Sequence, residues 1–362
     1  MGRIFNFSAG PAVLPLEILE EAAKEMVDYQ GLGLSIMEMS HRSKPYEKIH
    51  NEAIASIKQL LNVPDNFDIL FLQGGASSQF FMVPMNIAIE GKPCNYITTG
   101  VWSEKALKEA KILGKNVVEI ATSASTNHNR IPLDSEFKVD KDASYVHITT
   151  NNTIFGTQFK KLPETNGVPL VIDASSDILS WKVDWKNVGI IYAGAQKNAG
   201  PAGVVLVIIR KDLYEREKGP IPTVLKYSTH AKENSLYNTA PTFPIYMVGL
   251  NAKWLIKQGG VDGIMKMNEK KAGLIYDVID SSNDFYKGHA EKSCRSLMNI
   301  TFVLKDDSLN DSFNKEAEAL GLSGLKGHRS VGGFRASVYN AMPIEGCKKL
   351  ADFMKDFMKK NS

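Results

Sequence analysis

Short apolar segments recur between residues 69 and 210, separated by stretches long enough to hold a helix, a turn or a long loop. Most of them are continuously apolar rather than alternating, which is typical of strands buried on both faces of a mostly parallel sheet. We expect strands at residues 69–72, 96–99, 117–121, 145–149, 168–172, 190–195 and 204–209. Amphipathic segments that predict helices lie between or beside them, at residues 16–29, 46–61, 77–89 and 103–113. This alternation predicts an α/β fold.

After residue 209 the pattern changes. A loop-rich stretch at 219–244 precedes a helical pattern at 245–257, and the glycine-rich residues 259–263 interrupt it. The remaining pattern predicts a helix at 264–280, a strand at 298–304, a helix at 313–319, a strand at 333–337 and a helix at 344–359. We therefore expect a large domain at residues 16–260, and a smaller α+β domain formed by residues 1–15 with 261–362.

Composition narrows the class of protein. A chain of 362 residues with 43% hydrophobic and 23% charged residues is typical of globular proteins with two domains. The net charge of +3 provides no broad field for nucleic acid or a membrane, and the longest aliphatic run, residues 204–209, is too short to span a bilayer. Three widely spaced cysteines and no apolar export segment at the N-terminus lead us to expect a cytoplasmic protein with reduced thiols and no metal site.

Residues 73–79 follow a predicted strand and open a predicted helix with the sequence Gln-Gly-Gly-Ala-Ser-Ser-Gln. Free backbone amides at a helix N-terminus bind phosphate, and small residues allow an anion to approach closely. The same residues could form only a tight turn capped by Ser77 or Ser78. Because the segment does not fit the P-loop pattern, and residues 31–33 lack the third glycine of a dinucleotide fingerprint, nucleoside triphosphate and NAD are disfavoured.

Two charged residues follow predicted buried strands. Asp173 ends the strand near 168–172, and Lys197 follows the strand near 190–195. In an open α/β sheet ligands bind beyond the carboxyl ends of the strands, so both side chains are expected to reach one crevice. Pyridoxal phosphate needs a lysine for its Schiff base, an acid for its ring nitrogen and a cradle for its phosphate. The chain offers a candidate for each.

Several separated segments carry a resemblance to a known family. They are Phe-Asn-Phe-Ser-Ala-Gly-Pro-Ala at 5–12, Met-Ser-His-Arg at 39–42, Gly-Ala-Gln-Lys-Asn-Ala-Gly-Pro-Ala-Gly at 194–203 and Lys-Gly-His-Arg-Ser-Val-Gly-Gly-Phe-Arg-Ala-Ser at 326–337. Together with the spacing of Asp173 and Lys197, they resemble the phosphoserine aminotransferases, a family of class V pyridoxal-phosphate-dependent enzymes. The resemblance extends from residue 4 to about residue 357.

The resemblance implies a fold-type I enzyme with a mostly parallel seven-stranded sheet, helices on both faces and a smaller α+β domain. It implies a homodimer that uses pyridoxal 5'-phosphate to transfer an amino group from L-glutamate to 3-phosphohydroxypyruvate. The products would be O-phospho-L-serine, in L-serine biosynthesis, and 2-oxoglutarate. The sequence leaves open whether the chain also forms 4-phosphohydroxy-L-threonine in pyridoxine biosynthesis.

The resemblance also implies roles for individual residues. Lys197 corresponds to the Schiff-base lysine and Asp173 to the partner of the pyridinium nitrogen. Further cofactor contacts would come from Ala76, Ser77, Trp102, Thr153 and Gln196, and from Asn238 and Thr239 of the neighbouring subunit. The residues implied for the substrate anions are His41, Arg42, His328, Arg329 and Arg335. Among these, Arg335 suits the α-carboxylate because its guanidinium can bind a carboxylate with two parallel hydrogen bonds.

The chain departs from some relatives at two positions. Ser77 stands where some members carry an arginine, and Ala9 stands where some carry a serine. Neither departure puts the activity in doubt, but the sequence leaves open how they affect recognition of the substrate phosphate. The alternatives are another class V activity, such as alanine–glyoxylate transamination or cysteine desulfuration, and a binding protein that kept the fold without the chemistry. No cysteine lies in a loop suited to desulfuration, and intact Lys197 and Asp173 disfavour a binding protein.

Overall fold

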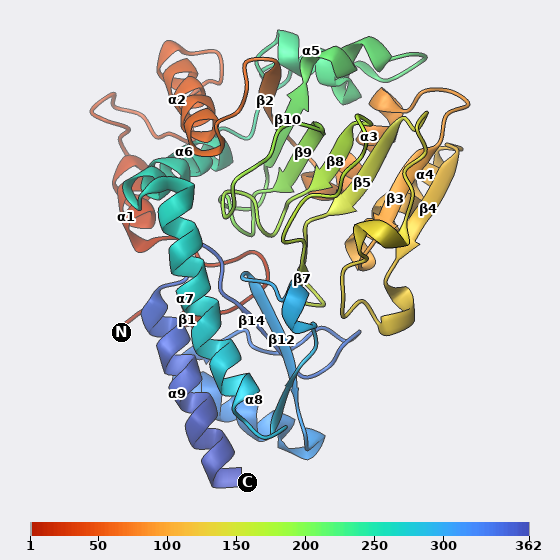
Figure 1. Ribbon diagram of the computed structural model, residues 1–362. Coiled ribbons are helices and arrows are strands. Elements are labelled where there is room, and N and C mark those ends of the chain that lie inside the picture. The colour runs from red at the N-terminus through yellow and green to blue at the C-terminus, as the bar shows by residue number, and fades with distance from the viewer. Residues whose placement is uncertain (1, 362) are drawn as a thin grey trace.

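A computed structural model describes residues 2–361 of the chain. Its centre is a seven-stranded sheet, which confirms the predicted sheet and its position in the chain (Figure 1). The strands are β2 (Phe67–Leu72), β3 (Cys94–Thr98), β4 (Val117–Thr122), β5 (Tyr145–Thr149), β8 (Leu170–Asp173), β9 (Val188–Gly194) and β10 (Val205–Arg210).

The order of the strands across this sheet is β2-β10-β9-β8-β5-β3-β4. Strands β9, β8, β5, β3 and β4 pair in parallel, whereas β10 is antiparallel to both of its neighbours. In the register of β8 and β9, Asp173 lies opposite Tyr192. Since Lys197 follows Tyr192 by only five residues, the topology brings Asp173 and Lys197 to the same edge of the sheet.

Helices cover both faces of the sheet. Helices α3 (Gly75–Ile87) and α4 (Val101–Ile112) pack on one face, with α5 (Tyr227–Lys232) nearby. Helices α2 (Lys44–Leu61) and α6 (Thr242–Lys257) pack against each other on the other face, and α1 (Leu16–Glu25) packs on α6. The α2–α6 contact is close because Gly249 faces Ala53: a Cβ at Gly249 would lie 3.2 Å from the Cβ of Ala53.

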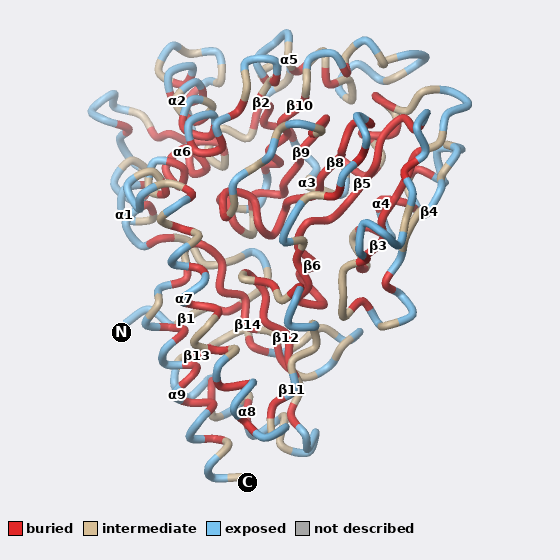
Figure 2. The backbone as a smooth tube through the Cα atoms, in the orientation of Figure 1, coloured by how far each residue is buried: buried red, intermediate tan, exposed pale blue. Residues whose placement is uncertain are grey.

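A second hydrophobic core lies at the other end of the molecule (Figure 2). It contains an antiparallel sheet in the order β11-β12-β14, covered by helices, as predicted for an α+β unit. Its elements are α7 (Gly260–Asp280), β11 (Tyr286–Gly288), β12 (Asn299–Leu304), α8 (Asn310–Ala319), β14 (Phe334–Ser337) and α9 (Ile344–Asn361). The N-terminal strand β1 (Phe5–Asn6) pairs with β13 (Leu322–Ser323) in this unit. The domain boundary near residue 260 stays a prediction.

The ends of several helices differ from the predictions. Helix α1 ends at Glu25, four residues before the predicted end, and α7 begins at Gly260 instead of residue 264. Gly263 is therefore helical, and glycine is favoured there because a Cβ would lie 2.1 Å from the carbonyl oxygen of Gln258. Helix α2 begins at Lys44, two residues earlier than expected, since the Ser43 side chain caps it.

Shorter elements escaped the sequence analysis. The hairpin of β6 (Asn151–Asn152) and β7 (Thr157–Gln158) has too few residues to produce a periodic pattern. The same holds for the short 3₁₀ helices at Ala124–Thr126, Asp134–Glu136, Lys211–Arg216, Thr223–Leu225, Lys292–Cys294 and Asp307–Leu309. Among the helices of residues 2–361, none is long and apolar enough to cross a membrane.

Candidate active site

Lys197 occupies the loop that follows β9, where its amino group meets residues from three other segments. Its Nζ donates a hydrogen bond to Oγ1 of Thr153 at 2.7 Å and lies 5.2 Å from the ring centroid of Trp102. Removal from water lowers the pKa of Lys197 to about 8, and the nearby Arg335 adds to this effect while Asp173 opposes it. An amine with such a pKa is substantially neutral near physiological pH and can act as a nucleophile or a base.

Asp173 ends β8 and is almost completely buried. Its Oδ1 accepts a hydrogen bond from the backbone N–H of Ser175 at 3.0 Å. Burial raises the pKa of Asp173, while the bonds from Ser175 and the charge of Lys197 partly offset the shift. A buried carboxylate at this position can hold a proton that it shares with a basic ligand atom.

The N-terminus of α3 lies where the sequence predicts an anion cradle. Gly74 and Gly75 adopt φ values of 83° and 64°, and a Cβ at Gly74 would lie 2.8 Å from the Cβ of Ser78. The Ser78 hydroxyl donates to the carbonyl groups of Gln73 and Gly75, which fixes the turn. Ala76 and Ser77 lie in the first turn of the helix, where backbone N–H groups lack intrahelical partners.

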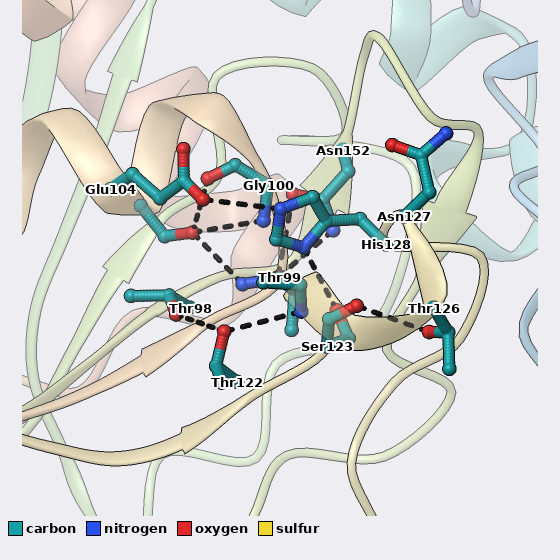
Figure 3. A network of polar contacts seen from close by, with 12 residues as sticks. Thr98, Thr99, Gly100, Glu104, Thr122, Ser123, Thr126, Asn127, His128 and Asn152 are labelled. Carbon is teal, nitrogen blue, oxygen red and sulfur yellow. Dashed lines mark hydrogen bonds and ion pairs between the residues drawn. The ribbon is translucent and has the colours of Figure 1, made fainter.

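A polar network joins the start of α4 to the segments around Asn152 and His128 (Figure 3). Asn152 donates from Nδ2 to Oγ1 of Thr99 at 3.0 Å, which joins the segment of Thr153 to the start of α4. His128 bridges Oε1 of Glu104 and Oγ of Ser123, each at 3.1 Å. This network ties α4 to the two loops beside it and thereby limits where the Trp102 ring can lie.

Positive side chains gather next to Lys197. The Nη1 of Arg335, on β14, donates to the carbonyl oxygen of Thr153 at 3.4 Å. Partial burial lowers the pKa of His328, and the charges of Arg335, Arg329 and Lys105 lower it further. The strand of Arg335 and the loop of Lys197 therefore meet at a group of positive charges that can bind anionic groups.

Lys105 was missed by the sequence analysis. Its Nζ lies 4.7 Å from the ring centroid of Trp102, and it is exposed. The sequence could have indicated Lys105, because it follows Trp102 by three residues and residues three apart on a helix lie on the same face. Ser175 was also missed, because nothing in the pattern distinguishes it from an ordinary turn residue.

Gln196 lies beside Lys197, and the N-terminal segment covers both. The carbonyl oxygen of Gln196 accepts a hydrogen bond from the N–H of Ala12 at 2.9 Å. A Cβ on Gly10 would lie 3.2 Å from Cγ of Lys197. This explains why the sequence at residues 5–12 belongs to the site although it is remote in the chain.

The remaining predicted residues lie apart from the Lys197 amino group. The carbonyl of Thr239 accepts a hydrogen bond from Gln73 at 2.8 Å, and Asn238 lines a cavity of about 220 Å³ with Gly74. His41 and Arg42 lie between α1 and α2, where Arg42 is exposed and His41 has a buried Nε2 without a partner. Neither is among the charged groups that shift the pKa of Lys197, His328 or Arg335.

Comparisons with known proteins place this geometry in a family. The model of the family "Aminotransferase class-V" matches residues 4–350. The chain is 56% identical to the phosphoserine aminotransferase of Lysinibacillus sphaericus (strain C3-41), over 99% of both proteins.

Solved structures agree with this match. The phosphoserine aminotransferase of Bacillus circulans subsp. alkalophilus is 51% identical and superposes with a TM-score of 0.96 over 99% of each chain. The pyridoxal-phosphate-bound phosphoserine aminotransferase of Trichomonas vaginalis is 41% identical, with a TM-score of 0.93 over 98% of this chain and 100% of that one. The chain therefore belongs to the class V aminotransferase family.

Proposed function

We propose that this chain catalyses amino-group transfer from L-glutamate to 3-phosphohydroxypyruvate, which yields 2-oxoglutarate and O-phospho-L-serine for L-serine biosynthesis. The observation that carries the proposal is the meeting of Lys197, Thr153 and Trp102 with the cations around Arg335 in one site. The activity of the similar phosphoserine aminotransferases, which match this chain over nearly its full length, supports the same reaction.

The residues of the site fit pyridoxal 5'-phosphate. Asp173 is a buried carboxylate suited to a protonated ring nitrogen, and Oγ1 of Thr149 and Nε1 of Trp102 are buried without a hydrogen-bond partner. The N-terminus of α3 suits the phosphate. We therefore assign the ring to Asp173, Trp102 and Thr153, and the phosphate to Ala76, Ser77 and Gln196, with Asn238 and Thr239 supplied by a neighbouring subunit.

When bound, this cofactor takes up the electrons released as a C–H bond beside the substrate nitrogen breaks. Lys197 supplies the amino group that accepts the α-proton from the substrate and returns a proton in the opposite half-reaction. Its lowered pKa keeps a useful fraction neutral at physiological pH. Thr153 orients the amino group through its 2.7 Å hydrogen bond, and Asp173 holds the proton on the ring nitrogen.

Substrate binding is assigned to the cations. Arg335 binds the α-carboxylate common to both substrates, while His328, Arg329, His41 and Arg42 bind the phosphate or the side-chain carboxylate. Lys105 adds a further positive charge, which acts on the pKa of His328. This charge is relevant because the chain carries Ser77 where some relatives carry an arginine. This concentration of positive charge suits a doubly charged phosphate. It therefore favours the phosphorylated keto acid over alanine, the substrate of an alanine–glyoxylate enzyme, whose side chain is small and uncharged.

An absorption spectrum of the purified holoenzyme tests the proposed reaction. L-Glutamate should bleach the long-wavelength band of the bound cofactor, and 3-phosphohydroxypyruvate should restore it. L-Alanine and glyoxylate serve as the matched pair for the competing activity. A band that responds to alanine but not to glutamate would overturn the proposal.

The pKa of Lys197 predicts how the cofactor-free protein takes up pyridoxal phosphate. Only the neutral amine attacks the aldehyde, so the rate of cofactor uptake should rise with pH and reach half of its maximum near pH 8. For an ordinary lysine the half-maximal rate would be reached near pH 10.5. Stopped-flow absorbance across pH 6–11 measures this rate. A midpoint near that of an ordinary lysine would contradict the desolvation of Lys197.

We also propose that the chain acts as a homodimer in which His41 and Arg42 complete the site of the partner subunit. Arg42 is exposed, and it is not among the charges that act on the pKa of Lys197 or His328. A fully active monomer in analytical ultracentrifugation would exclude this arrangement.

Mixing the impaired Arg42→Ala variant with the inactive Lys197→Ala variant tests the arrangement further. Arg42→Ala should raise the Michaelis constants of both substrates, by about 10- to 100-fold, because a charged hydrogen bond to each anion is lost. When Arg42→Ala subunits are exchanged with Lys197→Ala subunits, activity should reappear, since each mixed dimer then contains one intact site. Activity that stays at the level of the separate variants would place Arg42 in the site of its own chain.

Two finer assignments remain proposals. We propose a cytoplasmic location, which the three free cysteines at positions 94, 294 and 347 support because thiols persist in reducing compartments. We also propose that 3-hydroxy-2-oxo-4-phosphonooxybutanoate serves as a second amino acceptor, for pyridoxine biosynthesis. It differs from 3-phosphohydroxypyruvate by one small extension, against which a pocket discriminates by only about 10- to 200-fold.

A further inference from the structure

Lys271 is a fully buried lysine on α7. Its Nζ donates hydrogen bonds to the carbonyl oxygens of Val338 at 3.0 Å, Tyr339 at 2.6 Å and Asn340 at 3.3 Å. No carboxylate within residues 2–361 forms an ion pair with it. Burying an amine costs folding free energy, so an amine held by three carbonyl groups indicates that Lys271 has a specific role at this position.

The residues that Lys271 holds connect directly to the active site. They follow β14, the strand that carries Arg335. The backbone N–H of Asn340 donates to Oδ1 of Asn198 at 2.9 Å, and Asn198 immediately follows Lys197. One short segment therefore joins the strand of Arg335 in the small domain to the loop of Lys197 in the large domain.

Further buried amides strengthen this connection. Asn268, one turn before Lys271 on α7, donates to Oδ1 of Asn340 at 2.8 Å. Asn340 in turn donates from Nδ2 to the carbonyl of Leu179 at 3.0 Å, and Asn251 donates to the carbonyl of Ala199 at 2.9 Å. Asn198, Asn251, Asn268, Lys271 and Asn340, here called the polar junction, are each at most 6% exposed.

The geometry of these hydrogen bonds limits how the segments joined by the polar junction can be arranged. Side-chain hydrogen bonds have narrow distance and angle limits, so a cluster of buried amides and one amine permits few arrangements of the segments that it joins. Hydrophobic contacts between the two domains would tolerate sliding, whereas these bonds set one register. Residues 338–340 begin three residues after Arg335. Because this distance along the chain is short, a displacement of residues 338–340 would also move Arg335.

We propose that Lys271 is a positioning residue for substrate binding, which sets Arg335 relative to Lys197 and thereby the affinity for the α-carboxylate. The inference rests on the proposed function, in which Arg335 binds that carboxylate. Lys271 itself does not touch the substrate. It acts through the segment 338–340 and the bond between Asn340 and Asn198.

The test uses the holoenzyme with Lys271→Met, which keeps the aliphatic stem and removes the amine. Single-turnover bleaching of the cofactor band, measured against L-glutamate and O-phospho-L-serine concentration, separates the dissociation constant from the maximum rate. The dissociation constants of both substrates should rise about tenfold or more, because small displacements of a binding group are costly. Cofactor affinity should stay within about twofold. Lys270→Met, its exposed neighbour on the same helix, is the matched control and should change neither constant.

A double-mutant cycle separates positioning from a merely structural role. If Lys271 acts through Arg335, Lys271→Met should add nothing to the dissociation constants of Arg335→Ala. An additive effect, or a lowered melting temperature with unchanged dissociation constants, would overturn the inference. If Lys271→Met does not fold, Asn268→Ala can be used instead, because it removes one hydrogen bond of the polar junction and keeps the Lys271 amine. Unchanged dissociation constants in Asn268→Ala would likewise overturn the inference.

Arg335→Ala alone distinguishes the inference from the proposed function. If that variant binds both substrates with unaltered dissociation constants, the assignment of the α-carboxylate to Arg335 fails. If it weakens both while Lys271→Met weakens neither, the proposed function stands and the positioning role of Lys271 fails.

Discussion

Replacing Lys197 by alanine should lower the rate of transamination by about 10⁴-fold or more. General base catalysis by one side chain contributes up to about 10⁴-fold, and this variant loses the nucleophilic amine as well. Thr153 and Trp102 border the amine but cannot replace it, because a hydroxyl and an indole are poor bases at neutral pH. Formation of 2-oxoglutarate from L-glutamate, followed with a coupled assay, measures the loss.

Two controls separate lost chemistry from lost structure. Lys197→Arg keeps a positive charge but not a neutral amine, and it should be about as inactive as the alanine variant. The cofactor-free alanine variant should melt no lower than the parent at pH 7, since the desolvated amine costs the folded state stability below its pKa of about 8. Partial recovery of activity with a small primary amine would support the role. An alanine variant that retains a few per cent of the parent rate would refute it.

Asp173→Asn should lower the rate of transamination by about 100- to 1000-fold, the usual effect of removing one preorganised electrostatic contact. The amide has the same shape and can accept the bond from the Ser175 N–H, but it carries no charge to hold a proton on the ring nitrogen. Pyridoxal phosphate should still bind, with a shifted absorption band. Rates from the coupled assay, together with spectra of the loaded variant, check both parts.

Stability provides an independent readout for this variant. Burial raises the folded-state pKa of Asp173, so in the cofactor-free protein the protonated carboxyl group favours folding at low pH, and that contribution is lost as the pH rises. The cofactor-free Asp173→Asn protein should therefore be at least as stable as the parent at pH 7. Asp184→Asn, the same substitution at an exposed position, is the control for the substitution itself. A rate within tenfold of the parent would exclude the proposed role of Asp173.

The strands of the large sheet were predictable because burial on both faces makes most of them continuously apolar, as at residues 204–209. Helix ends were less predictable. Gly263 looked like an interruption but lies inside helix α7, where the close approach of the Gln258 carbonyl favours glycine. Short elements such as β6 and β13 have too few residues for any period.

For the site, the sequence by itself identified Lys197 and Asp173, because two charges after buried strands of one parallel sheet must meet at its carboxyl edge. It also predicted an anion cradle near Ala76, since glycines and small residues at the start of a helix are a local signal for one. Only the tertiary structure brought Lys105 beside His328 and revealed that Lys271 joins the strand of Arg335 to the loop of Lys197. These contacts join segments far apart in the chain, and no local pattern records which distant carbonyl or charge a side chain will reach.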